Sequence, residues 1–202
     1  MSQSWEQTYA SKSDEMLSWT QSWPGLSLEL IHTFGPPRGS VIDVGGGSSA
    51  LAGSLIEGGT PRCIVLDISP TALTRARSQV DPAVRDRIEW RVADILTADD
   101  VPEVDVWHDR AVFHFLVDGR ERAAYVTQAK RTVTPGGILI LGTFAPNGPA
   151  TCSGLPVRRY DAESLAAEFA PSFALRDVRY EIHKTPWGAT QPFIYVVMEC
   201  RR

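Results

Sequence analysis

The carboxylate of Asp43 stands two residues before three consecutive glycines, at the end of a short apolar run. The stretch SVIDVGGGSSAL, residues 40–51, predicts a buried strand over 41–44, a tight turn, and a helix over 48–57. Such a unit can hold a ligand, because backbone N–H groups and a helix N-terminus face the turn. Gly45, Gly47 and Ala50 also fit the spacing G-x-G-x-x-A, which is typical of dinucleotide sites.

Two further acids follow predicted strands. Asp67 ends the strand 63–67, twenty residues beyond Gly47, and Asp94 follows the strand 88–93. An acid in the position of Asp67 suits the ribose of a dinucleotide or of S-adenosylmethionine. Asp43 distinguishes between these two ligands, because a carboxylate near the turn would repel the pyrophosphate of a dinucleotide and attract the ammonium and sulfonium of S-adenosylmethionine. The residues therefore favour S-adenosylmethionine as the cofactor.

These side chains need a scaffold of alternating strands and helices. After 63–67, Ser69 and Pro70 predict the start of a helix; strands over 88–93 and 104–108, a helix over 119–133 and a strand over 138–144 follow. The turn Pro135-Gly136-Gly137 is expected to separate the last two. This alternation predicts an α/β fold with a doubly wound, mostly parallel sheet. A helix starting at Asp161 and two strand-like runs, 173–183 and 191–200, end the chain.

The composition and charge limit the number of domains and the kinds of partner. The chain has 202 residues and a formal charge of −4, which predicts one domain and gives no footprint for nucleic acid or a membrane surface. We expect a helical cap over residues 1–39 and a ligand-binding domain over 40–202. The absence of an apolar leader favours a cytoplasmic protein. Three widely spaced cysteines argue against a disulfide framework and against a metal site.

Five segments in this order, VIDVGGGSS, VLDIS, VADIL, VDVWHDRAVFHFL and TPGGILILGTF, resemble the class I S-adenosylmethionine-dependent methyltransferases. The resemblance implies a Rossmann-like sheet of seven strands with an antiparallel C-terminal hairpin. It also implies that the glycine loop holds the methionine part of the cofactor, that Asp67 binds the ribose hydroxyls and that Asp94 contacts the adenine amino group. The neighbouring Ile68 and Ile95, and Asp109, are expected as further cofactor contacts.

The methyl acceptor should lie near the end of the fourth strand, because ligands bind at the carboxyl edge of such sheets. Asp109, His114 and His183 are the candidate catalytic residues, although a base is needed only if the acceptor must lose a proton. His114, Phe115 and Arg159 are the candidate substrate contacts. The alternative interpretation makes Asp109 half of a structural ion pair with the adjacent arginine, His114 an oriented surface residue, and His183 a satisfied structural group.

Two local resemblances bear on the acceptor. VWHDRAVFHFL is similar to a segment of the thiopurine methyltransferases, and DEMLSWTQSWP is similar to the entry segment of the plant thiol and halide methyltransferases, which implies that Trp19 covers the cofactor. The same segments also resemble lysine methyltransferases that act on elongation factors. We therefore predict a methyltransferase for a small S, N or O nucleophile, working as a monomer or homodimer. A protein-lysine methyltransferase and a non-catalytic cofactor-binding protein are the alternatives.

Overall fold

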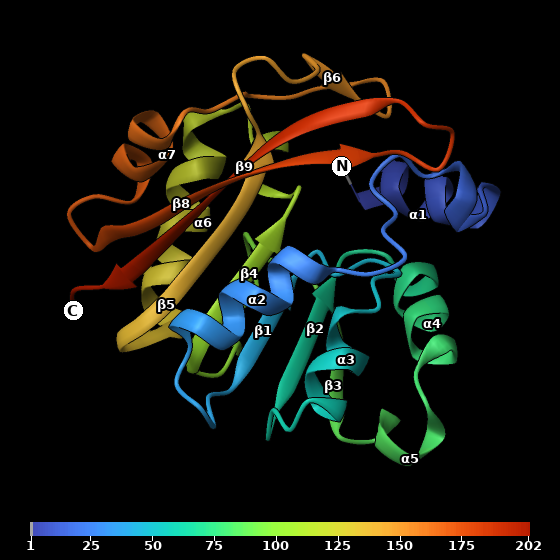
Figure 1. The fold of residues 1–202 in the computed structure, drawn as a ribbon, viewed down its shortest axis with the longest axis horizontal. Helices are drawn as coiled ribbons and strands as arrows, with labels where there is room; N and C mark the ends of the chain where they lie inside the picture. The colour runs from blue at the N-terminus through green and yellow to red at the C-terminus, as the bar shows by residue number, and fades with distance from the viewer. Residues whose placement is uncertain (1) are drawn as a thin grey trace.

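The computed structural model describes residues 2–202, with side chains from Trp5 onward (Figure 1). Its sheet has seven strands in the order β3-β2-β1-β4-β5-β9-β8. The five parallel strands are β1 (Val41–Val44), β2 (Cys63–Asp67), β3 (Ile88–Val92), β4 (Val104–Arg110) and β5 (Val133–Phe144). The strands β8 (Phe173–Lys184) and β9 (Thr190–Cys200) form an antiparallel hairpin, and β9 pairs with β5. The predicted sheet and its terminal hairpin are confirmed.

Helices cover both faces of this sheet. One face carries α2 (Gly25–Phe34) and α3 (Leu51–Glu57), and the other carries α6 (Gly119–Thr132) and α7 (Ala162–Phe169). The remaining helices are α1 (Ser2–Ser11), α4 (Pro70–Gln79), α5 (Pro82–Arg85) and the short 3-10 turns η1 (Asp14–Met16) and η2 (Phe113–Phe115). Among residues 2–202, no helix has the length and apolar character needed to cross a membrane.

Alternation along β1 decides which side chains reach which face. Ile42 and Val44 lie in the core beneath α6 and α7, whereas Val41 lies in the core beneath α2 and α3. Period-two alternation places Asp43 with Val41, on the face that α2 covers. A carboxylate there is buried, with 3% of the residue exposed, and needs a polar partner from the same side.

The N-terminal segment is part of this packing. Leu28, Leu30 and Ile31 of α2 are buried in the same core as Val41, so α2 behaves as a layer of the domain. α1 packs beside α4 at the end of the molecule where the parallel strands end. The division at residues 39 and 40 stays an interpretation.

Several boundaries differ from the sequence prediction. Residues 48–50 complete the glycine turn, so α3 begins at Leu51. Pro135-Gly136-Gly137 does not separate the helix from a later strand, because β5 already starts at Val133 and includes these residues. The pairing register of β5 with β4 shifts at this point, between Val104 and Val106. The expected loop 145–158 contains a short ribbon of β6 (Thr151–Cys152) and β7 (Leu155–Pro156).

Candidate functional site

The turn between β1 and α3 has backbone angles that favour glycine. Gly45 has a φ of 65° and Gly47 a φ of 56°, both in the left-handed region. A Cβ atom on Gly45 would lie 2.0 Å from Val112, and one on Gly47 would lie 2.3 Å from the hydroxyl oxygen of Tyr9. Glycine is therefore required at both positions for conformation and for space. The predicted glycine turn is present, although its neighbour Tyr9 was not foreseen.

Asp67 closes β2 and holds its carboxylate against this turn. The amide of Gly47 donates to Oδ2 and the amide of Ser69 donates to Oδ1, each at 2.8 Å. Burial raises the pKa of Asp67 to about 6, while the two amide hydrogen bonds oppose the rise. At neutral pH the group is therefore an ionised acceptor that faces the larger of two cavities.

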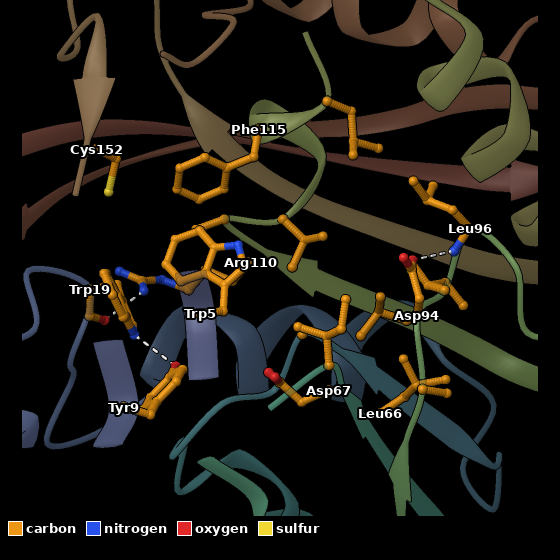
Figure 2. A pocket seen from close by; sticks show the side chains of 18 residues that line it. Trp5, Tyr9, Trp19, Leu66, Asp67, Asp94, Leu96, Arg110, Phe115 and Cys152 are labelled. Atoms are coloured by element: carbon orange, nitrogen blue, oxygen red, sulfur yellow. Dashed lines mark hydrogen bonds between the residues drawn. The ribbon is translucent and has the colours of Figure 1, made fainter. Parts of the chain in front are cut away.

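That larger cavity lies at the carboxyl edge of the parallel strands, where the strand order reverses between β1 and β4. It encloses about 900 Å³, counting its open mouth. One half is lined by Asp67, Ile68, Asp94, Ile95 and Leu96. The other half is lined by Trp5, Trp19, Arg110, Phe115 and Cys152, as Figure 2 shows.

The half lined by acids, hereafter the nucleoside half, collects the side chains expected at the strand ends. The Oδ1 atom of Asp94 accepts a hydrogen bond of 2.9 Å from the amide of Leu96, which fixes the carboxylate at the rim beyond β3. Ile68 and Ile95 add apolar surface on the same side. The structure thus brings together four of the predicted cofactor residues.

The other half, hereafter the aromatic half, is built largely by the N-terminal segment. The indole nitrogen of Trp19 donates a hydrogen bond of 3.1 Å to the hydroxyl of Tyr9. The ring of Trp5 meets Trp19 edge-on at 5.6 Å and Phe115 edge-on at 4.8 Å, measured between ring centroids. Trp19 and Trp5 therefore both line the larger cavity, and the contact of Trp19 with the cofactor stays a prediction.

Polar contacts hold α1 over the cavity. Glu6 accepts hydrogen bonds from the hydroxyls of Ser69, at 2.5 Å, and of Thr71, at the N-terminus of α4, where a negative charge is favourable. Arg75 of α4 donates to the carbonyl oxygens of Tyr9 and of Lys12. These contacts fix the aromatic side chains of α1 in place.

A smaller cavity of about 530 Å³ adjoins the glycine turn, and Asp43 lines it. Oδ1 of Asp43 lies 2.7 Å from Nδ1 of His108, and Nε2 of that ring lies 2.8 Å from Oγ of Ser27. All three residues are buried. His108 is not among the residues predicted from the sequence, because its position opposite Asp43 follows from the pairing of β1 with β4.

Asp109 does not line either cavity. Its carboxylate is fully buried and accepts hydrogen bonds from the amides of Val112 and Phe113, at 2.8 and 3.0 Å, and from the hydroxyl of Tyr125. Burial raises its pKa to about 6, against the opposing effect of the Tyr125 hydrogen bond. The geometry gives Asp109 a structural task in shaping the turn after β4, and does not place it at a cofactor or acceptor.

His114 and His183 are also turned away from the cavities. His114 is fully buried against Phe115 and Phe144, and burial followed by the charge of Arg110 lowers its pKa to about 3. His183 donates from Nε2 to the carbonyl oxygen of Ser18 at 2.7 Å. Both imidazoles are therefore used in packing and positioning.

Arg159 is exposed and donates to the carbonyl oxygen of Gly148 at 3.3 Å, away from both cavities. Arg110 lines both cavities instead. Among the predicted acceptor contacts, Phe115 lines the larger cavity, whereas His114 and Arg159 do not.

Comparisons with known proteins agree with this geometry. A methyltransferase domain family matches residues 41–137. A ribosomal protein L11 methyltransferase from Pelotomaculum thermopropionicum is 29% identical over 172 residues, covering 81% of this chain and 53% of its own. The present chain thus spans about half the length of that curated relative.

Two solved structures share the fold over nearly the whole chain. One structure concerns the conversion of a disulfide bond into a thioacetal group during echinomycin biosynthesis. It has a TM-score of 0.81 at 20% identity, and the match covers 100% of this chain and 92% of that chain. The other, the N-methyltransferase NodS of Bradyrhizobium japonicum with S-adenosylhomocysteine, has a TM-score of 0.75 at 18% identity and covers 98% of both chains. The methyltransferase domain match and the shared fold support a class I S-adenosylmethionine-dependent methyltransferase with S-adenosylmethionine as its cofactor. The local similarity to thiopurine methyltransferases stays a prediction.

Proposed function

We propose that this protein transfers the methyl group of S-adenosylmethionine to a small molecule with a nucleophilic S, N or O atom. The observation that carries the proposal is the continuity of the larger cavity, which runs from the nucleoside half directly into the aromatic half. A donor bound in the first half would meet an acceptor in the second, inside a pocket that α1 covers.

The donor's placement follows from the side chains. Asp67 would accept hydrogen bonds from the ribose hydroxyls, and Asp94 would accept one from the adenine amino group, with Ile68 and Ile95 against the base. The glycine turn and Asp43 take the methionine end, which the smaller cavity accommodates. Carboxylates suit these tasks because they offer only acceptors to hydroxyl, amino and ammonium donors.

When bound, the cofactor supplies a methyl carbon made electrophilic by its sulfonium. Transfer to the acceptor's lone pair would leave S-adenosylhomocysteine, and any proton on the acceptor would pass to water when the product leaves. Because charge is dispersed in this displacement, the protein's part is alignment and the exclusion of water. Trp5, Trp19 and Phe115 perform both tasks by walling the aromatic half.

Charge in the aromatic half favours a neutral or anionic acceptor. Arg110 is the charged side chain among its lining residues, whereas the two acids lie in the nucleoside half. A guanidinium beside a sulfonium disfavours an approaching ammonium, such as that of protonated lysine. The sulfur chemistry and the N-methylation described for the two structural relatives are in keeping with a small nucleophile.

A protein acceptor is the second candidate, because the curated relative is a ribosomal protein methyltransferase. Both candidates are tested by incubating the purified chain with methyl-labelled S-adenosylmethionine and, in parallel, thiols, amines, phenols and a lysate protein fraction. We expect S-adenosylhomocysteine to form and the label to enter a small molecule. Label found only in protein would favour the protein-lysine methyltransferase, and binding without turnover in every arm would favour a non-catalytic role. Asp67→Ala, which removes the ribose contact, is the control for background reaction.

A further inference from the structure

Three buried side chains from three different elements form a chain of hydrogen bonds behind the glycine turn. Ser27 belongs to the first turn of α2, His108 to β4 and Asp43 to β1. The two contacts measure 2.8 Å between Ser27 and His108 and 2.7 Å between His108 and Asp43. Each residue is at most 3% exposed.

The direction of these bonds follows from chemistry. A carboxylate can only accept, so Nδ1 of His108 carries the hydrogen that reaches Oδ1 of Asp43. In a neutral ring Nε2 is then an acceptor, which the hydroxyl of Ser27 satisfies. The ring is thus held at both nitrogens, and it holds one oxygen of the carboxylate.

The second oxygen of Asp43 is left available. Among the described residues no donor meets Oδ2, and the adjacent Gly46 leaves space beside it, since a Cβ there would lie 2.7 Å from this oxygen. Oδ2 is not among the buried atoms that lack a partner, and Asp43 lines the smaller cavity, so this oxygen is open to that cavity. An oxygen without a donor, on a residue that lines a cavity, therefore indicates a site for a cationic or N–H group of a ligand.

We propose that His108, backed by Ser27, is a positioning residue that aims Oδ2 of Asp43 at the α-ammonium of the cofactor's methionine end. This inference rests on the proposed function, which places that end in the smaller cavity. A carboxylate fixed before the ligand arrives loses less conformational freedom on binding, so its charge-assisted hydrogen bond contributes more to affinity. Through Ser27, the N-terminal segment also takes part in holding the cofactor.

The test compares two ligands that share the nucleoside. S-adenosylhomocysteine carries the amino-acid end, and 5′-methylthioadenosine lacks it. We expect His108→Ala to raise the dissociation constant of S-adenosylhomocysteine about tenfold while changing that of 5′-methylthioadenosine by less than about twofold, measured by calorimetry. His108→Asn, whose side-chain amide can still donate toward Asp43, should restore most of the difference, and Ser27→Ala should give a smaller selective loss.

The control is Ser40→Ala. Oγ of Ser40 donates to Asp105 at 2.9 Å, at the opposite ends of the same two strands, so its loss should change neither affinity. Equal weakening of both ligands by His108→Ala would make His108 a packing residue, and unchanged affinities would show that Asp43 needs no support; either result overturns the inference. Should His108→Ala not fold, Ser27→Ala carries the same comparison. If the unaltered protein binds neither ligand, the proposed function itself fails.

Discussion

The guanidinium of Arg110 donates a hydrogen bond of 2.9 Å to the backbone carbonyl oxygen of Trp19, and so joins the end of β4 to the segment that covers the cavity. Its Nε atom donates to the hydroxyl of Tyr195 at 3.0 Å, and its Cζ atom lies 4.6 Å from the centroid of the Phe193 ring. Arg110 is therefore fixed on three sides, and the position of Trp19 depends on it.

We expect Arg110→Met to weaken cofactor binding by about 1–2 kcal/mol and to lower kcat, because losing a charge-assisted hydrogen bond frees the Trp19 segment. Arg110→Lys keeps the charge but cannot reproduce the forked geometry, so it should recover only part of the loss. Calorimetry with S-adenosylhomocysteine and initial-rate kinetics measure the two effects. Wild-type affinity and turnover in Arg110→Met would show that Trp19 is held by other contacts.

The buried carboxylate of Asp109 should matter for stability. Asp109→Ala leaves two backbone amides and the Tyr125 hydroxyl without their acceptor, and we expect a loss of about 2–5 kcal/mol in the free energy of unfolding. Tyr125→Phe removes a single donor to Asp109 and should cost about 1–2 kcal/mol. Urea denaturation gives both values. A stable Asp109→Ala variant with selectively impaired turnover would instead show that Asp109 acts in catalysis.

His114 is a second candidate catalytic residue whose side chain is buried in the core. Since its pKa is lowered to about 3, it is neutral throughout the range in which the protein would work. His114→Ala should lower the unfolding free energy by about 2–4 kcal/mol through the cavity it creates, comparable to other large-to-small core changes. The pH dependence of kcat above pH 5 should not change. A lost titration step in that profile would identify His114 as an acid or base after all.

The sequence was informative where local pattern and topology together determine position. The glycine turn, Asp67 and Asp94 could be placed because each stands at the end of a strand, and parallel strands end at one edge of the sheet. The same reasoning failed near the end of β4, where Asp109 lies in the strand and faces the core beside Tyr125, and His114 lies in η2 and is buried too. Side-chain direction in an irregular turn has no period from which it can be predicted.

The residues that were missed share a different cause. Trp5 and Tyr9 reach the cavity from α1, which is far from the glycine turn in the sequence, and His108 meets Asp43 only through strand pairing. Such contacts depend on how distant segments pack. A prediction of β1 beside β4, in register, is the single step that would have revealed His108.

Cofactor affinity should depend on pH through Asp67. Its pKa in the free protein is about 6, and ribose hydroxyls donate best to the ionised form, so binding releases a proton at lower pH. The dissociation constant of S-adenosylhomocysteine should rise up to about tenfold per unit as pH falls below 6, and be flat above 7. Asp67→Asn should bind more weakly and lack this dependence. Calorimetry from pH 5 to 8 provides the comparison.

Unfolding of the protein would not explain this loss of cofactor affinity at low pH. A carboxyl whose folded pKa is raised from 3.8 to about 6 binds more protons in the folded state between those values. Its contribution therefore makes the fold more stable, not less, as pH falls through this window. A melting temperature recorded at each pH separates the two effects, and pH-independent affinity of the unaltered protein would contradict a ribose contact by Asp67.

Phe115 should separate acceptor binding from cofactor binding. Its ring lies against Trp5 in the aromatic half, while the nucleoside half is built by other residues. Removing it opens that wall and takes away apolar contact area, so Phe115→Ala should raise the KM of the small acceptor about tenfold or more and change the affinity for S-adenosylhomocysteine by less than about twofold. Val117→Ala, an exposed change two residues along the chain, is the matched control and should alter neither quantity. Equal losses of acceptor and cofactor binding in Phe115→Ala would mean that the cofactor, and not the acceptor, fills the space beside Trp5.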